Sequence, residues 1–503
     1  MMPRLATPSL PPTLAHLIEA LGEVELMGDG GARIVGIRHD SREVGIGDLF
    51  VAMVGASADG HKHIDAAISA GAAALLVSRR PETEPSVPVA IVPNTRAALA
   101  AVSIRFFRQP SAELDAIGVT GTNGKTTVTY ILEALFRAAG GRPAIVGTTG
   151  HRFDGVTTPL PNTTPESVEL QRLLRGWVDA GATHAALEVS SHGLSTHRVD
   201  GCRFAVRVFT NLSRDHLDFH GDMEAYFQAK RRLFTDFEGG PSAICVDDPR
   251  GTALLKDAPA AVTFSVRPDS KAAIRPIDLP TLTIDRTRAS LITPAGRVDL
   301  DSSLPGMPNL ENLLAAAAVG VALDLPVDAI RRGLSTPVAV PGRFQRVADL
   351  EGGRIVIVDY AHTPEALSQA LKVVRTLTPG RVGVVFGCGG SRDAGKRPEM
   401  GRAAADGADQ VFLTSDNPRW EDPDAILEQA LAGVPAERRG AVEADVDRTA
   451  AIEAAIAWAR PGDAVLVAGK GHETYQEIRG ERRPFDDISI CRRALAGQEA
   501  RWT

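Results

Sequence analysis

Residues 118–127 have the types and spacing of a loop that holds a polyphosphate. They read Gly-Val-Thr-Gly-Thr-Asn-Gly-Lys-Thr-Thr, between an apolar run at 114–119 and a helical pattern at 128–136. Glycines let backbone N–H groups approach phosphate oxygens, and the N-terminus of the following helix adds a positive dipole. Lys125 would neutralise charge on the β- and γ-phosphates, and the Thr126 hydroxyl would ligate Mg²⁺.

The loop departs from the standard phosphate-loop spacing. Five residues, not four, separate Gly118 from Gly124, and Val119 stands where the first glycine should be. An ordinary glycine-rich turn is the alternative, but the position between a strand and a helix favours the phosphate loop. The residues of the loop expected to bind ATP are Gly121, Thr122, Asn123, Gly124, Lys125, Thr126 and Thr127.

Two further strands end in groups that suit a metal ion. Glu188 lies in the apolar run 185–189, where an unpaired buried carboxylate would be costly. His216 follows the strand predicted at 207–212. Because ligands gather at the carboxyl ends of strands in an open parallel sheet, we expect Thr126, Glu188 and His216 to meet at one Mg²⁺ site.

Composition restricts the class of protein. The chain has 503 residues, which corresponds to about three domains, and a net charge of −7, which argues against nucleic acid or an anionic membrane as partner. Its four cysteines are scattered, so we expect neither disulfides nor a zinc site, and a reduced cytoplasm. No apolar run is long enough to cross a membrane, and no signal peptide is recognisable.

Patterning along the chain predicts an α/β protein of three domains. Residues 1–111 form a small α/β unit, and residues 112–340 a central P-loop ATPase-like parallel sheet. Alternating polar and apolar residues at 263–300 predict an antiparallel appendage to it. In residues 341–503 each strand stops at a loop rich in glycine and charge, which is typical of a doubly wound, Rossmann-like domain.

Thr120-Gly-Thr-Asn-Gly-Lys-Thr126 resembles the loop of the Mur ligases and of their folylpolyglutamate synthetase relatives, which use ATP to join an amino acid to a carboxylate. The run Ala229-Lys230-Arg-Arg-Leu-Phe234 is similar to the stretch that carries a CO₂ adduct on its lysine in Mur ligases. The resemblance implies catalytic roles for Lys125, Glu188, His216 and Lys230. It also implies a metal site formed by Thr126, Glu188, His216 and N6-carboxylysine at 230.

The turn Asp40-Ser41-Arg42 and the segment around Asp59-Gly60 resemble the uridine-nucleotide-binding domain of one Mur ligase branch. On local grounds alone they would be surface turns. Thr164 and Pro165 predict the cap and first residue of a helix, which is compatible with substrate contact at its N-terminus. The substrate residues that the resemblance implies are His39, Ser41, Ala56, Ser57, Ala58, Asn162, Thr163, Thr164, Ser190, Thr196 and Arg198.

Four further residues are expected at the nucleotide. Asn309 and Asn312 lie three apart on one face of a predicted helix. Capping of that helix by Asn309 and reading of the adenine by both amides are equally supported by the residues alone; the resemblance favours the base. It also places Arg343 and Asp359 at the nucleotide once the domains close. Thr363 is expected to cap the next helix.

The segment Asp416-Asn417-Pro418-Arg419 predicts a stiff turn that presents a guanidinium, because Pro418 fixes its own φ and restricts Asn417. Arginine suits bidentate capture of a carboxylate, although an exposed surface turn is the alternative. The motif resembles that of Mur ligases that add meso-diaminopimelate. There Arg392 and Arg419 would clamp its carboxylate, and Glu473 and the Gly469 carbonyl would accept from its ammonium. The implied residues are Arg392, Asp416, Asn417, Pro418, Arg419, Gly469 and Glu473.

Taken together, the resemblance implies ATP-dependent addition of meso-diaminopimelate to UDP-MurNAc-L-Ala-D-Glu through an acyl phosphate, with Mg²⁺, in a cytoplasmic monomer. A folylpolyglutamate synthetase is the first alternative, but it would lack the Asp40–Arg42 and Asp416–Arg419 turns. A non-catalytic nucleotide-binding regulator is the second, and the combination of Lys125, Glu188, His216 and Lys230 argues against it.

Overall fold

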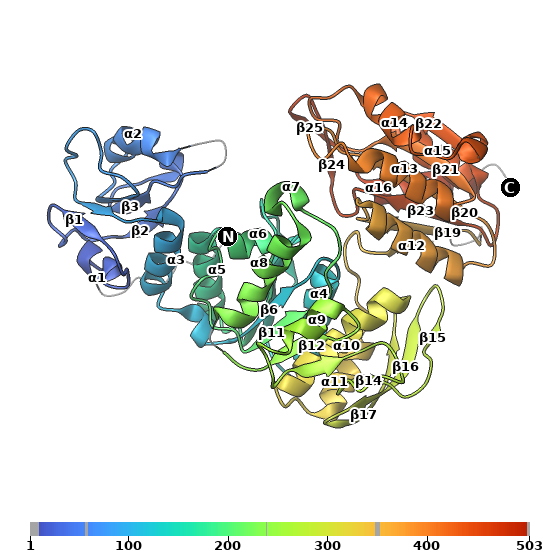
Figure 1. The fold of residues 1–503 in the computed structure, drawn as a ribbon, viewed down its shortest axis with the longest axis horizontal. Coiled ribbons are helices and arrows are strands. Elements are labelled where there is room, and N and C mark those ends of the chain that lie inside the picture. Colours follow the sequence, from blue (N-terminus) through green and yellow to red (C-terminus); the bar gives the residue numbers. More distant parts are fainter. Residues whose placement is uncertain (1–9, 56–58, 238, 348–352, 500–503) are drawn as a thin grey trace.

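The computed structural model describes residues 10–55, 59–237, 239–347 and 353–499. Figure 1 shows three α/β parts: the N-terminal part at the left, the middle part at the centre and bottom, and the C-terminal part at the upper right. The predicted α/β class with several parallel-dominated sheets is confirmed. The boundaries at 111/112 and 340/341 stay predictions.

The N-terminal part is a small sheet with strand order β1-β5-β4-β3-β2 among the described residues. Only β1 runs antiparallel to its neighbour, and Leu49 and Leu76 are fully buried in the core. Its strands are β1 (Glu25–Met27), β2 (Gly36–Arg38), β3 (Asp48–Val51), β4 (Ala74–Val77) and β5 (Val89–Ile91). Its helices are α1 (Leu14–Ile18), α2 (Ile64–Ser69) and α3 (Thr95–Phe106).

The middle part is built on a larger sheet, of order β13-β12-β11-β6-β10-β7-β8-β9 in the described chain. All pairs from β13 to β7 are parallel. The strands are β6 (Asp115–Thr120), β7 (Pro143–Gly147), β8 (Gly150–Phe153), β9 (Val156–Thr158), β10 (His184–Glu188), β11 (Val206–Phe209), β12 (Ser242–Cys245) and β13 (Val262–Phe264). Because β6, β10 and β11 are adjacent and parallel, their carboxyl ends lie together, as predicted.

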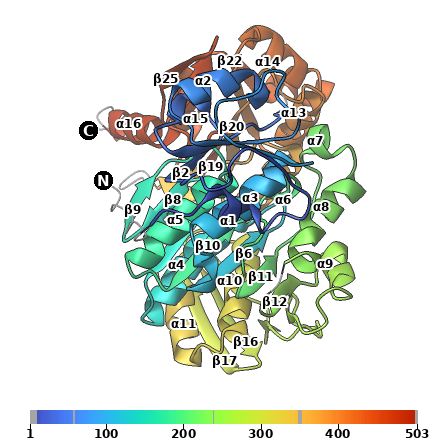
Figure 2. The ribbon, with the colours of Figure 1, turned by 90° about the vertical axis from the view of Figure 1, so that its left-hand side faces the viewer.

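Helices cover both faces of this sheet. One core packs α4, α10 and α11 against it, and the other packs α5, α6 and α8. In Figure 2 the N-terminal part, in blue, faces the viewer, with the middle part behind and below it. The helices are α4 (Lys125–Ala138), α5 (Ser167–Asp179), α6 (Ser191–Ser195), α7 (Leu217–His220), α8 (Met223–Thr235), α9 (Pro249–Leu254), α10 (Met307–Ala322) and α11 (Val327–Ser335).

The predicted antiparallel appendage is present. It consists of β14 (Arg275–Pro276), β15 (Thr281–Leu282), β16 (Thr287–Thr293) and β17 (Gly296–Ser302), paired antiparallel through β16. A second antiparallel extension, β8 and β9 at the edge of the central sheet, was not predicted.

The C-terminal part is a doubly wound sheet of order β18-β19-β23-β20-β21-β22 in the described residues. Strands β19 to β22 run parallel, and separate cores cover the two faces. The strands are β18 (Gln345–Val347), β19 (Ile355–Asp359), β20 (Val382–Cys388), β21 (Gln410–Ser415), β22 (Val442–Asp445), β23 (Ala464–Ala468) and the hairpin β24 (Tyr475–Ile478) and β25 (Glu481–Pro484). The helices are α12 (Pro364–Leu377), α13 (Lys396–Gly407), α14 (Pro423–Leu431), α15 (Arg448–Trp458) and α16 (Asp487–Glu499).

Helix starts were predicted with mixed success. Thr363 caps α12 as expected, because its side chain accepts from the Ala366 N–H. The prediction for Thr164 was wrong: α5 begins at Ser167, and the Thr164 hydroxyl instead donates to the Glu188 carbonyl at 2.8 Å. A contact with a neighbouring strand end outweighed the local capping pattern. The capping alternative for Asn309 was also wrong, since Gly306 is the N-cap of α10.

Candidate active site

The phosphate loop lies where β6 ends and α4 begins. Gly124 has a φ of +89°, which favours glycine, and a Cβ there would lie 2.3 Å from the Asn312 Oδ1. A Cβ on Gly121 would lie 1.9 Å from the Thr210 Oγ1. The loop is therefore closely surrounded by the neighbouring strand and by α10, and only glycine fits at these two positions.

Asn211, at the end of β11, fixes the shape of the loop. Its side-chain Oδ1 accepts from the Asn123 N–H at 2.9 Å, and its carbonyl accepts from the Thr122 N–H at 2.8 Å. Its Nδ2 donates to Glu311 Oε1 on α10 at 3.0 Å. Sequence reasoning missed Asn211, although it ends a strand beside the loop, a position where such groups gather.

Two lysine side chains converge on one carbonyl of the loop. Lys125 Nζ and Lys230 Nζ each donate to the Gly121 oxygen at 2.9 Å, and Lys230 Nζ lies 4.5 Å from the centre of the Tyr226 ring. Lys230 is only 1 % exposed. Burial, and then the charge of Lys125, hold the pKa of Lys230 well below its usual value. Burial likewise lowers the pKa of Lys125, against the influence of Glu188 and Asp215.

Glu188, at the end of β10, is a buried carboxylate, 1 % exposed. Its Oε1 accepts from the Thr148 N–H at 2.9 Å, and its Oε2 accepts from the Thr148 hydroxyl at 3.1 Å. The ion pairs between described residues do not include it. Thr148, which follows β7, thus holds the side chain in place, and no cation of the described residues lies within 4.0 Å of the carboxylate. Thr148 was not predicted as a site residue, although it also ends a strand.

His216 reaches the same pocket from the loop after β11. Its Nε2 lies 3.4 Å from Asp215 Oδ2, and its ring meets the His192 ring edge-on at 4.8 Å. Burial lowers the pKa of His216 to about 4, which Asp215 partly opposes, so the imidazole is neutral at neutral pH. In the described chain, His, Cys, Asp and Glu side chains do not form any group of three suited to a metal.

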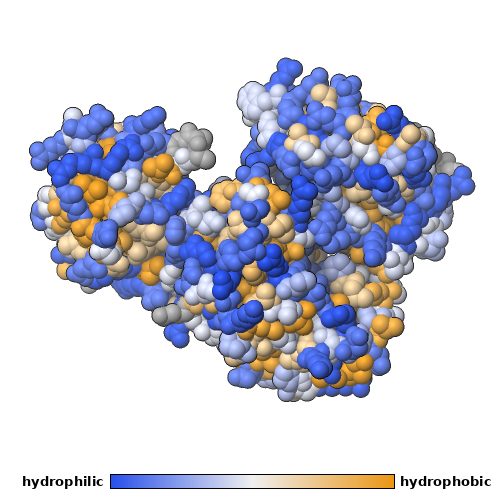
Figure 3. Space-filling model, viewed as in Figure 1, coloured by the Kyte–Doolittle hydropathy of each residue, from blue (hydrophilic) through white to orange (hydrophobic). Residues whose placement is uncertain are grey.

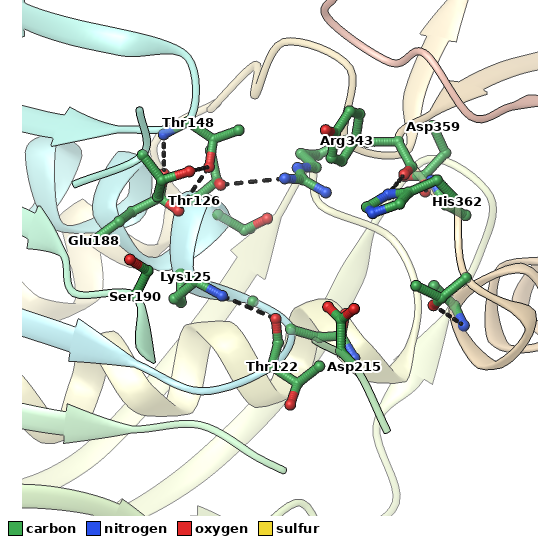
Figure 4. Close-up of a pocket in the computed structure, with 18 of the residues that line it drawn as sticks. Thr122, Lys125, Thr126, Thr148, Glu188, Ser190, Asp215, Arg343, Asp359 and His362 are labelled. Atoms are coloured by element: carbon green, nitrogen blue, oxygen red, sulfur yellow. Dashed lines mark hydrogen bonds between the residues drawn. The ribbon is translucent and has the colours of Figure 1, made fainter. Parts of the chain in front are cut away.

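The C-terminal part closes the pocket from the opposite side. Arg343 Nη2 is 3.4 Å from Thr126 Oγ1, and its guanidinium lies over the Tyr360 ring at 4.6 Å. Figure 4 shows Arg343 pointing toward Thr126, with Asp359 and His362 on the side of Arg343 away from Thr126. Asp359 accepts from the Phe344 and Ala361 N–H groups, and burial raises its pKa, which Arg343 opposes.

The pocket thus brings together most of the residues predicted for catalysis and phosphate binding. Figure 3 shows that hydrophilic residues predominate on the surface where the middle and C-terminal parts meet. The lining residues are Thr122, Asn123, Gly124, Lys125, Thr126, Thr127, Thr148, Thr163, Glu188, Ser190, Asp215, His216, Arg343, Asp359, Tyr360, Ala361, His362, Thr363 and Ala366. Asn309 and Asn312 lie outside this lining; Asn312 Nδ2 donates to Asn309 Oδ1 at 3.3 Å.

The residues predicted for the nucleotide-sugar substrate are spread over two parts. Thr163 and Ser190 line the pocket, and Asn162 is exposed beside it. The Thr196 hydroxyl donates to the His192 carbonyl at 2.6 Å. Ser41 opens a short 3₁₀ turn capped by Asp40. Ala56, Ser57 and Ala58 lie outside the described residues.

Ion pairs connect the N-terminal part to the middle part. Glu166 accepts from Arg96 on α3 at 3.1 Å and pairs with Arg198 at 3.0 Å, and Arg198 also donates to the Thr164 carbonyl. His39 Nδ1 lies 3.5 Å from Glu169 Oε1 on α5. Arg198 and His39 therefore face the junction of the two parts.

The residues predicted for the amino-acid substrate gather at the carboxyl ends of β20, β21 and β23. Arg419 has a φ of +52°; its N–H donates to the Glu477 carbonyl, and its Nη1 donates to the Gly390 carbonyl at 3.0 Å. Its Nε lies 3.7 Å from Glu477 Oε2, and the side chain is 20 % exposed. The alternative of a fully exposed surface arginine is therefore wrong. Arg392 is exposed in the loop after β20.

Lys470, between the predicted residues Gly469 and Glu473, was not singled out in the sequence. Its side chain is fully buried, and Nζ donates to Asn417 Oδ1 at 3.0 Å and to Glu473 Oε2 at 3.2 Å. Asn417 Nδ2 also donates to Glu473 Oε2, at 2.8 Å. A lysine between two glycines suggests an exposed residue, and only the fold reveals its burial.

The fold and the pocket define a three-domain ligase class, and the comparisons identify it. The chain matches the family models described as "Mur ligase family, catalytic domain" at residues 33–108, "Mur ligase middle domain" at 119–320 and "Mur ligase, glutamate ligase domain" at 342–471. The chain belongs to the Mur ligase family.

Its similar relatives include two named UDP-N-acetylmuramoyl-L-alanyl-D-glutamate–2,6-diaminopimelate ligase. That of Geobacter metallireducens is 44% identical over 496 residues, covering 94% of this chain and 96% of the relative. That of Bacillus licheniformis is 42% identical over 474 residues, covering 92% and 94%. A solved structure with the same name is 34% identical, has a TM-score of 0.69, and covers 97% of this chain and 100% of its own.

More distant structures share the fold. The MurF ligase of Thermotoga maritima, solved with ADP, is 20% identical with a TM-score of 0.64, covering 93% of this chain and 98% of its own. The folylpolyglutamate synthase of Mycobacterium tuberculosis is 20% identical with a TM-score of 0.61, covering 80% and 94%. Separately, no helix among the described residues is long and apolar enough to span a membrane.

Proposed function

We propose that the chain joins meso-diaminopimelate to the D-glutamyl side-chain carboxylate of UDP-MurNAc-L-Ala-D-Glu at the expense of ATP, in peptidoglycan precursor synthesis. The observation that carries the proposal is the pocket in which Lys125, Glu188 and Arg343 face one another from two domains. The relatives at 42–44% identity support the choice of substrates.

The phosphate loop holds the triphosphate of ATP. N–H groups at the start of α4 and the ammonium of Lys125 face the β- and γ-phosphates, and Arg343 approaches them from the C-terminal domain. The γ-phosphoryl group passes to the substrate carboxylate; an acyl–oxygen–phosphorus bond forms, and ADP leaves. Asn309 and Asn312 are proposed at the adenine, and Asp359 orients the segment that carries Arg343 through its bond to the Phe344 N–H.

The residues present fit Mg²⁺. Glu188 is a buried carboxylate without an ion-pair partner in the part of the chain that the structure describes, and Mg²⁺ takes oxygen ligands, commonly one or two carboxylates with substrate phosphates. Thr126, Glu188, His216 and carboxylated Lys230 would hold it. When bound, Mg²⁺ would offset the negative charge that accumulates as the phosphoryl group is transferred.

Lys230 is proposed to carry the CO₂ adduct. Carboxylation needs a neutral amine, and the lowered pKa of Lys230, caused by burial and by the charge of Lys125, favours that form. The adduct would place a negative charge beside Lys125, which attracts the Lys125 ammonium. Electron density at Lys230 in crystals of the folded protein tests this, and an unmodified lysine in crystals equilibrated with bicarbonate would overturn it.

The amino acid approaches from the C-terminal domain. Its reacting amine attacks the acyl carbon and forms a tetrahedral intermediate. The bond between the acyl carbon and the phosphate oxygen then breaks, phosphate leaves with the electron pair of that bond, and the amine proton passes to solvent. Arg392 and Arg419 bind the distal carboxylate; Glu473 and the Gly469 carbonyl accept from the distal ammonium. Holding the two substrates on separate domains supplies much of the rate enhancement.

His39, Ser41, Asn162, Thr163, Thr164, Ser190, Thr196 and Arg198 are proposed to hold the UDP-muramoyl-dipeptide, together with Ala56, Ser57 and Ala58. The Thr196 contribution would come from its backbone or methyl group, since its hydroxyl is used by His192. We further propose a monomer in the cytoplasm, which suits four free, buried cysteines.

The test is phosphate release by the purified protein. Release that requires ATP, UDP-MurNAc-L-Ala-D-Glu and meso-diaminopimelate together supports the proposal. Release that depends instead on folate and glutamate would select a folylpolyglutamate synthetase, and no turnover with either pair would select a nucleotide-binding regulator.

A further inference from the structure

Lys470 is a charged group that the proposed reaction does not use. Its side chain is fully buried in the C-terminal domain, and the loop that carries it follows β23 directly. Burying an ammonium is costly unless it is paired and hydrogen-bonded. The groups that compensate it are therefore informative. Besides the Tyr475 ring, whose centre lies 5.6 Å from Nζ, they belong to the loops proposed for diaminopimelate.

The first partner is Asn417. Lys470 Nζ and the Glu477 N–H both donate to Asn417 Oδ1, at 3.0 Å and 2.9 Å. With its oxygen fixed in this way, the Asn417 amide must direct Nδ2 toward Glu473 Oε2, 2.8 Å away. Lys470 and the Glu477 N–H thus fix the orientation of the Asn417 amide together, and of these two donors Lys470 is the side chain.

The second partner is Glu473. Its Oε2 accepts from both Lys470 Nζ and Asn417 Nδ2. Among the described residues no group donates to Oε1, and the side chain is 19% exposed. The carboxylate is therefore held by one oxygen and offers the other to a ligand.

The third partner is Asp416, whose Oδ1 lies 3.8 Å from Lys470 Nζ. Two carboxylates around one ammonium leave a net charge of −1 on this cluster. Without Lys470 the charge would be −2, in a partly buried site where charges interact more strongly than in water. Beside it, Arg419 is already balanced by Glu477.

We infer that Lys470 is a specificity-determining positioning residue. It helps to orient the Asn417 and Glu473 side chains and limits the negative charge of the site. A zwitterionic distal group is therefore preferred over a lone ammonium. This rests on the proposed function. Diaminopimelate carries both an ammonium and a carboxylate at its distal end, whereas lysine carries only the ammonium. A more negative site would favour lysine.

The experiment compares wild type with Lys470→Gln and Lys470→Met. Phosphate release is followed with meso-diaminopimelate and, separately, with L-lysine as the amine donor. Each variant should raise the KM for diaminopimelate about 10- to 100-fold, the loss expected for a hydrogen bond to a charged group, and leave the KM for ATP within about twofold. The ratio of kcat/KM for diaminopimelate to that for lysine should fall. An unchanged ratio and KM would overturn the inference.

The double variant Lys470→Met with Glu473→Gln guards against misfolding, because it removes both charges of a buried pair together. If Lys470 acts through Glu473, adding Lys470→Met to Glu473→Gln should change kcat/KM for diaminopimelate by less than about threefold. Fully additive losses would overturn the inference.

Arg381→Met is the matched control. Arg381 pairs with Asp463 at the opposite edge of the same sheet, at 2.6 Å. Its loss removes an ion pair of the same domain and should leave both KM values and the donor ratio unchanged. If wild type itself shows no diaminopimelate-dependent release, the proposed function fails; if wild type turns over and the Lys470 variants match it, only the present inference fails.

Discussion

The pocket proposed for the nucleotide and the site proposed for the amino acid differ in how their charged side chains are paired. In the pocket, Glu188 is buried without an ion-pair partner among the described residues, and Lys125 and Lys230 crowd one carbonyl. In the amino-acid site, Lys470 pairs with Glu473, and Arg419 pairs with Glu477. We therefore expect the pocket to take highly charged ligands that supply counter-charges. At the proposed amino-acid site most charged side chains are paired within the protein, so we expect the geometry of the site to select the ligand.

Two further buried cations of the C-terminal domain are also paired with carboxylates. Arg448 and Asp487 are both fully buried and form a two-pronged pair at 2.7 and 2.8 Å. Arg448 also donates to the Ala468 carbonyl at the end of β23. Arg397, buried as well, pairs with Glu421 and donates to the Gly389 carbonyl. These cations support the loops that carry Gly469 and Arg392.

The largest expected effect is on turnover, from a change at the pocket that contains Lys125. Lys125→Ala should lower turnover by about 10³-fold or more, because in the proposed reaction its ammonium stabilises the negative charge of the transferring phosphoryl group. Phosphate release at saturating substrates measures it, and thermal unfolding checks that the variant is folded. Arg331→Ala, in an exposed pair with Asp328 on α11, is the control. Activity within tenfold of wild type would contradict the proposed role.

The next effect concerns stability. Asp487→Ala leaves Arg448 buried and unpaired, so the free energy of unfolding should fall by about 3–5 kcal/mol. Urea unfolding measures the change. Asp328→Ala removes one partner of an exposed pair and should change stability by less than about 1 kcal/mol. Equal changes in the free energy of unfolding for the two variants would mean that the buried Arg448–Asp487 pair contributes no more to stability than an exposed pair.

Arg419→Ala tests selection by geometry. The KM for diaminopimelate should rise about 10- to 100-fold, because a bidentate contact to a carboxylate is lost, while the KM for ATP stays nearly constant. Arg482→Ala is the matched control: this exposed arginine lies over the Tyr475 ring, on the neighbouring hairpin. Equal increases in the two KM values would count against the assignment of Arg419 to the amino acid.

The smallest effect is a pH dependence near the phosphate loop. Burial raises the pKa of Glu311 from 4.5 to about 7, partly opposed by its hydrogen bond from Asn211. Between these values the folded protein keeps a proton that the unfolded chain has released, so stability from this group is lost as pH rises toward 7. Glu311→Gln should therefore reduce the loss of stability between about pH 5 and about pH 8, by on the order of 2 kcal/mol. Thermal unfolding at the two pH values measures it, and an unchanged pH profile would exclude Glu311 as the cause.

Sequence patterns predicted best those motifs and secondary-structure elements that depend on residues close together in the chain. The glycines and Lys125 identify the phosphate loop, and the strand ends that carry Glu188 and His216 do meet it in one pocket. Thr164 shows where this reasoning fails: a local capping pattern was outweighed by a contact with Glu188 from a neighbouring strand. Thr148 and Asn211 were missed because nothing in their own segments distinguishes them from other polar residues after strands.

By itself the sequence determined the α/β class, many of the strands and helices, the strand–loop–helix arrangement around Lys125, and the family. These depend on periodicity, backbone preference and motifs, which act over a few residues. Only the tertiary structure decided which charges are compensated. Lys470 is buried and contacts Asn417 and Glu473, and Glu188 has no ion-pair partner among the described residues; both situations arise where the ends of separate strands come together. Electrostatic energies depend on distance and burial in space, and neither can be read from spacing along the chain.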